Sequence, residues 1–372
     1  MYTTRPLSLL RRQPEASSRP PPEGNNSGYL IVKSAADDSE DMQQMSPWAS
    51  STRVWELPFR QNRVLKVTDG EDEEAALFVP VLDQPLASNR YYAVVANGHH
   101  KGLVGACSRE DDVATDCLCR CIYDVEPRPF HPADVYQQIE VVQLRRGRFT
   151  ARAVAADGIQ RGFATVRASC RPLSNGDYWK VYESTSRRFN LRDAVGLDAA
   201  LRLRQITDAA AVCPAATSTA AVVGRWYCPF FLLKEDGLVP RKQMDGGAFY
   251  EVALEQRWEL HGAGVAKLGS VTALIGGRVE ARRESRAPWD EDGYAWFRAA
   301  ATGQRIGLCV SLWERMRWEE HNVEWEDKEE EEEVGEVAAR WSVLVERFVV
   351  KRLHGPVAVA FHFVHLKKVR AR

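Results

Sequence analysis

Four of the eight cysteines fall within fifteen residues, so this stretch is the first place to look for chemistry. They are Cys107, Cys117, Cys119 and Cys121. Thiolates are strong ligands for zinc and can take part in redox reactions. The stretch therefore predicts either a metal or redox site, or a tightly packed structural segment.

The spacing of these cysteines favours packing over metal binding. In an extended segment, Cys117, Cys119 and Cys121 place their thiols on one face, roughly 6.5–7 Å apart along the strand. A tetrahedral zinc with sulfurs at about 2.3 Å needs its ligands within about 4 Å of each other. Reduced cysteine packs as a small hydrophobe, so we expect buried thiols and no cofactor. Under the zinc alternative, further ligands near Cys117 would be Cys107, His99, His100 and His131.

A second set of polar residues alternates with aromatic residues in segments that we expect to be strands. Neighbours on a strand point to opposite faces, so Glu255 and Arg257 should share one face. Likewise, Arg315 and Arg317 should share the face opposite Glu314. Antiparallel neighbours would then set Glu against Arg across the sheet, each pair contributing roughly 0.2–1 kcal/mol.

Two interpretations of these charged residues remain open. The first is a charged outer face over an aromatic core. The second is a polar cavity lined by Glu255, Arg257, Glu314, Arg315, Arg317, Glu346 and Arg347.

Motifs for nucleophilic or nucleotide chemistry are weak, and we predict no catalytic residue. The glycines of Gly262–Gly269 lead into an apolar strand-like segment, whereas phosphate binding needs a helix N-terminus. The sequence has no Gly-x-Ser-x-Gly elbow. His362 and His365 are three residues apart in a predicted strand, so they should face opposite ways. A triad assembled in space stays open, because triads are defined by geometry.

Net charge and hydropathy limit the classes of partner that the chain could bind. The net charge is −1 and the sequence pI is near 6.7, so the chain as a whole does not attract nucleic acid, and we expect no nucleic-acid partner. The basic hairpin tip Arg145–Arg148 with Arg152, and the tail Lys367–Arg372, are expected to be solvated charge. No apolar run approaches the roughly 18–20 residues that span a bilayer, so we expect no membrane insertion.

Short apolar segments with polar or glycine breaks predict β-strands along both halves. In the first half they are Tyr29–Lys33, Val64–Thr68, Leu77–Leu82, Tyr91–Ala96, Lys101–Ala106, Ile139–Leu144 and Phe149–Ala155. In the second half they are Trp226–Lys234, Phe249–Leu260, Val271–Ile275, Val279–Arg283, Tyr294–Ala299, Gly307–Trp318, Ala339–Arg352 and Val357–His365.

One helical segment separates the two sets of strands. Asn190-Leu-Arg-Asp resembles a capping box, and Leu197, Ala200 and Leu201 share a helical face. The following residues are rich in Ala, Thr and Ser and favour a linker. The sequence thus predicts a mainly β protein (α+β at most), with two sandwich-like antiparallel β halves and a short helical segment between them.

The predicted domain boundaries follow from these breaks. We expect an N-terminal arm at 1–27, a β-rich domain at 28–208, a linker at 209–221 and a second β-rich domain at 222–372. The acidic run Asp327–Glu333 has no apolar face and predicts a disordered loop at 326–338. The apolar part of the arm is too short for a secretory signal, so we expect a cytoplasmic or nuclear protein that is not secreted.

Several segments also resemble a plant-specific family known as domain of unknown function 1262. They include MYTTRPLSLLRR, PPPEGNNSGYLIV, FVPVLDQPLASNRYY, CLCRCIYDVEPRPFHPADVYQQIEV, VGRWYCPFFLLKE, FYEVALEQRWE and WERMRWE. The resemblance runs in order from Met1 nearly to Arg372. It implies a flowering-plant source and an arm that belongs to the module. It brings no activity, cofactor or site residue.

Taken together, these observations predict a non-enzymatic intracellular binding or interaction protein with an unknown protein or small-molecule ligand. One alternative is a zinc- or redox-responsive protein that uses the Cys107–Cys121 cluster. The other is a hydrolase with no recognisable motif.

Overall fold

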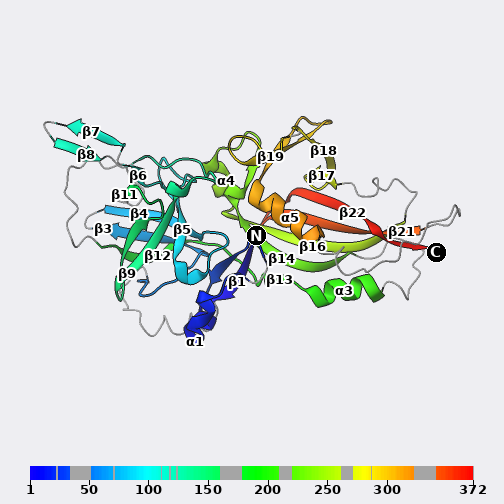
Figure 1. Cartoon of the computed structure of the whole chain (residues 1–372), viewed down its shortest axis with the longest axis horizontal. Coiled ribbons are helices and arrows are strands. Elements are labelled where there is room, and N and C mark those ends of the chain that lie inside the picture. Colours follow the sequence, from blue (N-terminus) through cyan, green and yellow to red (C-terminus); the bar gives the residue numbers. More distant parts are fainter. Residues whose placement is uncertain are drawn as a thin grey trace. The chain divides into compact units, whose positions relative to one another are not determined.

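The chain is mainly β, with antiparallel sheets in both halves and a few short helices (Figure 1). The predicted fold class is therefore confirmed. The computed structural model describes residues 1–21, 24–33, 52–69, 72–109, 111–116, 119–122, 125–159, 178–208, 220–260, 271–285, 287–321 and 341–371. The predicted acidic loop at 326–338 lies outside these residues, as does 209–219 of the predicted linker.

Contacts divide the chain into two compact units. The N-terminal unit comprises Tyr2–Asp193 and Leu238–Ala248, and the C-terminal unit comprises Met1, Ala194–Gly237 and Phe249–Arg372. The helical segment that we expected at the end of the first half therefore groups with the second. A short stretch from the second half groups with the first.

A six-stranded antiparallel sheet forms the centre of the N-terminal unit, in the order β10-β9-β5-β4-β3-β12. Its strands are β3 (Arg63–Asp69), β4 (Asp72–Pro80), β5 (Arg90–Val95), β9 (Gln138–Arg145), β10 (Arg148–Ala153) and β12 (Lys180–Arg188). Two small pairs accompany it: β6 (Ser108–Arg109) with β11 (Gly158–Ile159), and β7 (Val113–Asp116) with β8 (Cys119–Ile122). The short 3-10 helices η2 (Leu86–Ser88) and η3 (Val135–Gln137) lie in its connections.

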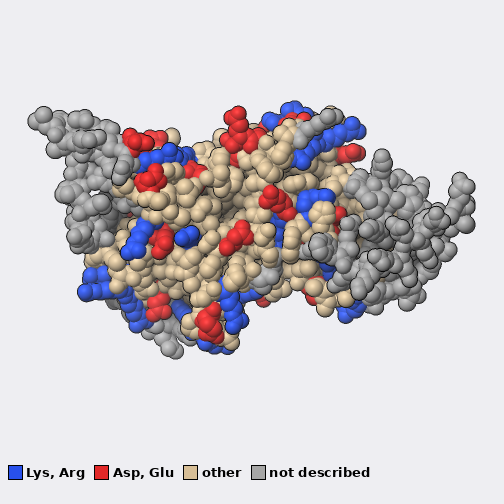
Figure 2. Space-filling model, in the orientation of Figure 1, with Lys and Arg blue, Asp and Glu red and all other residues tan. Residues whose placement is uncertain are grey.

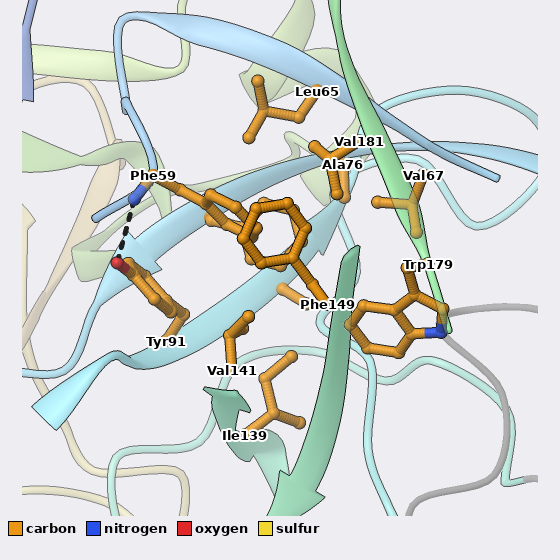
Figure 3. Packing of buried hydrophobic residues seen from close by; sticks show 12 residues of the cluster. Phe59, Leu65, Val67, Ala76, Tyr91, Ile139, Val141, Phe149, Trp179 and Val181 are labelled. Carbon is orange, nitrogen blue, oxygen red and sulfur yellow. Dashed lines mark hydrogen bonds between the residues drawn. The ribbon is translucent and has the colours of Figure 1, made fainter. Parts of the chain in front are cut away.

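The core of this unit is aromatic and apolar (Figure 3). The ring of Phe59 lies 4.8 Å from that of Phe78 and 5.1 Å from that of Phe149, both edge-on. The backbone N–H of Phe59 donates a hydrogen bond to the hydroxyl oxygen of Tyr91 at 3.1 Å. Burial raises the pKa of Tyr91, so this hydroxyl stays neutral. Such edge-on pairs contribute beyond the area they bury.

Buried charge in the same unit gathers on Glu183 of β12. Its carboxylate contacts the guanidinium of Arg60 and lies 3.1 Å from that of Arg63. All three side chains are at most 9% exposed.

The N-terminal arm is folded. It contains β1 (Tyr2–Pro6), α1 (Leu7–Arg12) and the 3-10 helix η1 (Pro14–Ser18), and β1 pairs in parallel with β2 (Gly28–Val32). Leu7 and Leu10 pack in a small cluster with residues of β2 and η2. Because apolar side chains of the arm are buried, it is an integral part of this unit.

The second segment of the N-terminal unit, Leu238–Ala248, contains α4 (Pro240–Gly246). Lys101, 6% exposed, forms an ion pair with Asp245 of this helix. At Gly102, φ is +87° and an added Cβ would lie 2.6 Å from the backbone of Pro240. Only glycine allows this approach, so the contact with α4 depends on it.

The C-terminal unit is built on a long antiparallel sheet with the order β15-β20-β19-β18-β17-β22-β21-β16-β14, and β13 pairs with β14. Its strands are β13 (Gly196–Leu197), β14 (Ala221–Pro229), β15 (Leu233–Glu235), β16 (Phe249–Leu260), β17 (Val271–Ile275), β18 (Val279–Arg283), β19 (Tyr294–Ala299), β20 (Arg305–Cys309), β21 (Trp341–Arg352) and β22 (Val357–Ala371). The helices are α3 (Ala199–Asp208), η4 (Phe230–Leu232) and α5 (Val310–His321).

Three local predictions were wrong. The predicted strand Gly307–Trp318 is a strand only to Cys309 and then becomes α5. The helix after residue 190 begins at Ala199, well beyond the predicted cap. The segment Lys101–Ala106 forms only isolated bridges through Val104.

The error in α5 has a simple physical cause. Leu312 and Met316 are four residues apart and both fully buried, as are Arg315 and Glu319. Residues i and i+4 share one face of a helix. The mixture of aromatic and charged residues fits this period as well as it fits alternation along a strand.

Of the described helices, none is long and apolar enough to cross a membrane.

Candidate functional site

Polar side chains from five elements meet on one face of the long strands in the C-terminal unit. We call this cluster the Glu346 network. Each member is at most 5% exposed. The members are Arg202, Gln256, Arg315, Glu319, Glu346 and His365.

The pleat of the sheet brings three of these residues together. Gln256 of β16 is registered with Glu346 of β21, which is registered with Phe363 of β22. Residues directly opposite share a face, and His365 follows Phe363 by two, so it shares that face too. The pairing of β21 with β22 shifts register just before Val345, beside His365. Such irregularities re-aim side chains and often lie at functional sites.

Two helices supply the remaining members. The carboxylate of Asp198 accepts a hydrogen bond from the backbone N–H of Leu201 at 2.8 Å, which fixes the start of α3. Arg202 follows in the first turn of that helix. Arg315 and Glu319 lie one turn apart on α5. The network therefore connects both helices to the sheet.

Glu346 is the centre of the network. Arg202 donates to both of its carboxylate oxygens, from Nε at 2.8 Å and from Nη2 at 2.6 Å. The side-chain amide of Gln256 donates to Oε1 at 2.7 Å. Nε2 of His365 lies 3.2 Å from Oε2. One carboxylate thus accepts hydrogen bonds from three side chains, and the bidentate pair with arginine fixes its orientation.

A second carboxylate completes the charge balance. Nη2 of Arg202 donates to the backbone carbonyl of Glu319 at 2.9 Å, and its Nη1 lies 3.5 Å from the Glu319 carboxylate. Nη2 of Arg315 donates to Oε1 of Glu319 at 2.6 Å. The guanidinium of Arg315 also lies 4.8 Å from the ring of Trp318. Two guanidinium groups and two carboxylates therefore neutralise each other inside the unit.

Electrostatics keep Glu346 ionised. Burial alone would raise the pKa of this carboxyl, but the charge of Arg202 and hydrogen bonds from His365 and Arg202 outweigh it and lower the pKa to about 2. A group with this pKa is a poor proton carrier near neutral pH, because proton transfer works best when the pKa lies near the operating pH.

The chemistry that this arrangement supports is structural. It holds guanidinium, carboxylate, amide and imidazole groups, and its described hydrogen bonds involve no hydroxyl or thiol that could act as a nucleophile. Its members are also shielded from solvent. A buried ion-pair network of this kind fixes the position of helices on a sheet, because a misplaced helix would leave a charge unpaired.

Three of the seven residues predicted to line a polar cavity lie on the opposite face of the sheet. Glu255 is registered with Arg347, and their charged groups are 3.7 Å apart. Arg257 pairs with Glu259. His362 is registered with Arg347, so it faces away from His365. Burial and the charges of Arg347 and Arg257 lower the pKa of His362 to about 4.

The remaining four predicted residues all involve α5 or the network. Arg315 and Glu346 are members of the network. Glu314 is exposed. Arg317 pairs with Glu320 at 3.0 Å on the helix surface. Because residues 310–321 form a helix, the expectation that Glu314 lies opposite Arg315 and Arg317 on a strand was wrong.

Only one of the four clustered cysteines has a described side chain. Cys107 is 3% exposed and unpaired, and burial raises the pKa of its thiol to about 11. A buried thiol with a raised pKa is a poor nucleophile. The side chains of Cys117, Cys119 and Cys121 lie outside the described part of the chain. Within that part, no group of three or more His, Cys, Asp or Glu side chains could hold a metal ion.

Four members of the network were missed from the sequence. Arg202 and Glu319 lie on helices whose patterns gave no reason to bury a charge. Gln256 and His365 alternate correctly with buried apolar neighbours. Neighbouring residues on a strand point to opposite faces, so Glu346 and Arg347 cannot both line one cavity. This signal could have assigned the predicted residues to the two faces of the sheet.

Comparisons with known proteins give limited information. Residues 23–118 match the family described as "Protein of unknown function (DUF1262)", and this stretch belongs to the N-terminal unit. No curated protein sequence matches the chain. Among solved structures, the chain is similar to "Crystal structure of Cry35Ab1", with 9% identity and a TM-score of 0.45, over 84% of this chain and 90% of that one.

Proposed function

We propose that this chain is a non-enzymatic binding or interaction protein. The observation that carries the proposal is the closure of the Glu346 network. A catalytic acid or base must come within hydrogen-bond reach of its substrate. The groups best suited to that role in the C-terminal unit are instead bonded to one another and shielded from solvent. Such a network makes a rigid scaffold, and rigid elements are what a precise binding surface needs.

The proposed setting is the cytoplasm or nucleus of a plant cell, with a protein or small molecule as the ligand. The plant source rests on the resemblance of the sequence segments given above. A reducing compartment is supported by three free, buried thiols, those of Cys107, Cys228 and Cys309. Thiols stay unpaired most readily where disulfides do not persist.

A turnover assay tests the absence of catalysis. The purified full chain is incubated with generic esterase, glycosidase and phosphatase substrates, alongside the variants Glu346→Gln and His365→Gln. We expect the same background rate in all three proteins. Turnover by the wild type that either variant loses while keeping its circular dichroism spectrum would replace the proposal with a hydrolase.

Metal analysis of the same sample tests the zinc alternative. We expect less than stoichiometric zinc, and no change in metal content on Cys117→Ser. One zinc per chain that this substitution removes would make the protein a metalloprotein.

A further inference from the structure

The tip of the β9–β10 hairpin carries more positive charge than its surroundings neutralise. We use the name basic tip for six residues at and beside this turn: Arg53, Trp55, Arg145, Arg146, Arg148 and Tyr178. The only described carboxylate paired with it is that of Glu56, 3.6 Å from Arg146. In Figure 2, Lys and Arg side chains gather at the lower left, where β9 ends in Figure 1, with some acidic side chains close by.

The register of the hairpin opposes two arginines. Arg145 is the partner of Arg148 across the turn. Like charges directly opposite each other on a sheet are destabilising. Both side chains are exposed, and Arg145 has no ion-pair partner among the described residues. The fold therefore tolerates a repulsion that a single Glu or Gln at either position would remove.

Three of the four arginines of the basic tip lie against aromatic rings. The guanidinium of Arg53 lies 4.5 Å from the ring of Trp55, and that of Arg146 lies 5.8 Å from it. The guanidinium of Arg148 lies 4.3 Å from the ring of Tyr178. Stacked arginines lose less rotamer freedom when they bind an anion, so such a surface is organised in advance.

Hydrogen bonds fix the turn against the Trp55 segment. The carbonyl of Trp55 accepts from the N–H of Gly147 at 2.8 Å and from the side chain of Gln143 at 2.9 Å. Nη2 of Arg53 donates to the carbonyl of Gly147 at 2.8 Å. At Gly147, φ is +71° and an added Cβ would lie 2.7 Å from the Trp55 ring. The hairpin, the indole and Arg53 thus form one rigid unit.

We propose that the basic tip binds single-stranded nucleic acid. Arginines next to planar aromatic groups are the combination that recognises a single strand, because guanidinium groups contact phosphates and planar groups stack with bases. The indole of Trp55 is 38% exposed. The chain as a whole is nearly neutral, so the attraction is local to the tip.

An anionic membrane fits this surface less well. Membrane binding by a surface loop needs apolar side chains that insert among the lipids. Leu144 is 51% exposed, but Trp55 is pinned by Gly147 and Arg53 and does not project freely. One leucine buries little area. The inference rests on the proposed function in one respect, that the chain is a binding protein. Its ligand is a nucleic acid instead of the protein or small molecule proposed above, and the basic tip is a binding surface instead of the solvated charge expected from the sequence.

Fluorescence anisotropy with a labelled twelve-nucleotide single-stranded RNA tests the inference on the full chain. We expect binding whose affinity falls as salt rises from 50 to 200 mM. Arg146→Glu/Arg148→Glu should weaken binding at least tenfold. It should also reduce the slope of log K against log salt by about 1.4, since each contact in a single strand contributes about 0.7. Tyr178→Ala should weaken binding about fivefold or more by removing a stacking surface.

The matched control is Arg278→Glu/Arg282→Glu, which makes the same charge change at exposed sites in the C-terminal unit. It should leave RNA affinity within twofold of wild type. Equal losses in both double variants, or no RNA binding by the wild type, would overturn the inference. If Arg146→Glu/Arg148→Glu leaves RNA binding unchanged, the basic tip is not the binding site. The proposal that the chain is a binding protein would still stand. Tip-dependent binding to phosphatidylserine vesicles without RNA binding would assign the tip to a membrane surface.

Discussion

The two units bury charge in different ways. In the N-terminal unit, the core around Phe59 is aromatic, and a single buried carboxylate, that of Glu183, contacts the guanidinium groups of Arg60 and Arg63. In the C-terminal unit, Arg202 and Glu346 lie between two helices and the sheet, at the centre of a shared network. An apolar core is held by non-directional packing, whereas a network is held by specific partners. The second unit therefore depends on complete sets of residues.

The largest effect is expected from Glu346→Ala. This change leaves Arg202 buried without its bidentate acceptor, which should cost roughly 3–5 kcal/mol of unfolding free energy. Hydrogen exchange of amides in β16 and β21, together with urea unfolding, measures the loss. The double variant Arg202→Met/Glu346→Leu should recover part of it, because well-packed apolar residues can replace a buried ion pair. Recovery is incomplete because Gln256 and His365 still lack the acceptor that Glu346 provides. Equal losses in the single and double variants would contradict this dependence on partners.

A core substitution in the other unit should follow a different rule. Leu65→Ala removes a fully buried side chain and should cost roughly 2–5 kcal/mol, read from hydrogen exchange in β4 and β5. Leu65→Met preserves volume and should cost less than about 1.5 kcal/mol. A Leu65→Met variant as unstable as Leu65→Ala would show that this core, too, needs specific partners.

A smaller effect is expected at the start of α3. Asp198→Ala removes the N-cap hydrogen bond to Leu201 and should cost about 1 kcal/mol. Asp198→Asn keeps an acceptor and serves as the control. The increase in exchange should be confined to the first turn of α3, because Arg202 still holds the helix to the sheet. Loss of protection across β21 would mean that the network depends on the cap.

The last effect is absent at neutral pH, develops only on acidification and concerns His362. Its pKa in the folded state is about 4, below the unfolded value near 6.5. The unfolded state therefore binds the proton more tightly, and stability falls as pH drops from 6.5 toward 4. His362→Gln should remove this part of the acid sensitivity. Urea midpoints of both proteins between pH 7 and 4 measure it, and curves that stay parallel would refute it.

Much of the sheet was predictable from the sequence. Alternation located Phe249–Leu260 and most of the strand that ends at Arg352, because a strand packed on a core repeats every two residues. Alternation also placed His362 and His365 on opposite faces. The helix α5 was not predictable in this way. Its run of tryptophan, arginine and glutamate satisfies both periods, and the decision between them is made by partners far along the chain.

The network was only partly predictable for a related reason. Arg315 and Glu346 were selected as polar residues among aromatics, but Glu255 and Arg347 were selected with them. A single sequence does not say which charged residue a helix will cover. Arg202 is buried while its neighbour Leu203 is 48% exposed, which reverses the usual preference. Arg202 is buried because it pairs with Glu346 and Glu319, which lie more than a hundred residues away in the sequence.

The contribution of Leu238–Ala248 to the N-terminal unit bears on how the protein is made. A ribosome must add residues well beyond Asp193 before Asp245 emerges to neutralise the ammonium group of Lys101. Until then, the growing polypeptide carries an incomplete unit. A gene fragment that stops at residue 193 would therefore encode a product lacking one of its own structural parts, and a fragment intended to stand alone would have to supply that short helix as a separate piece.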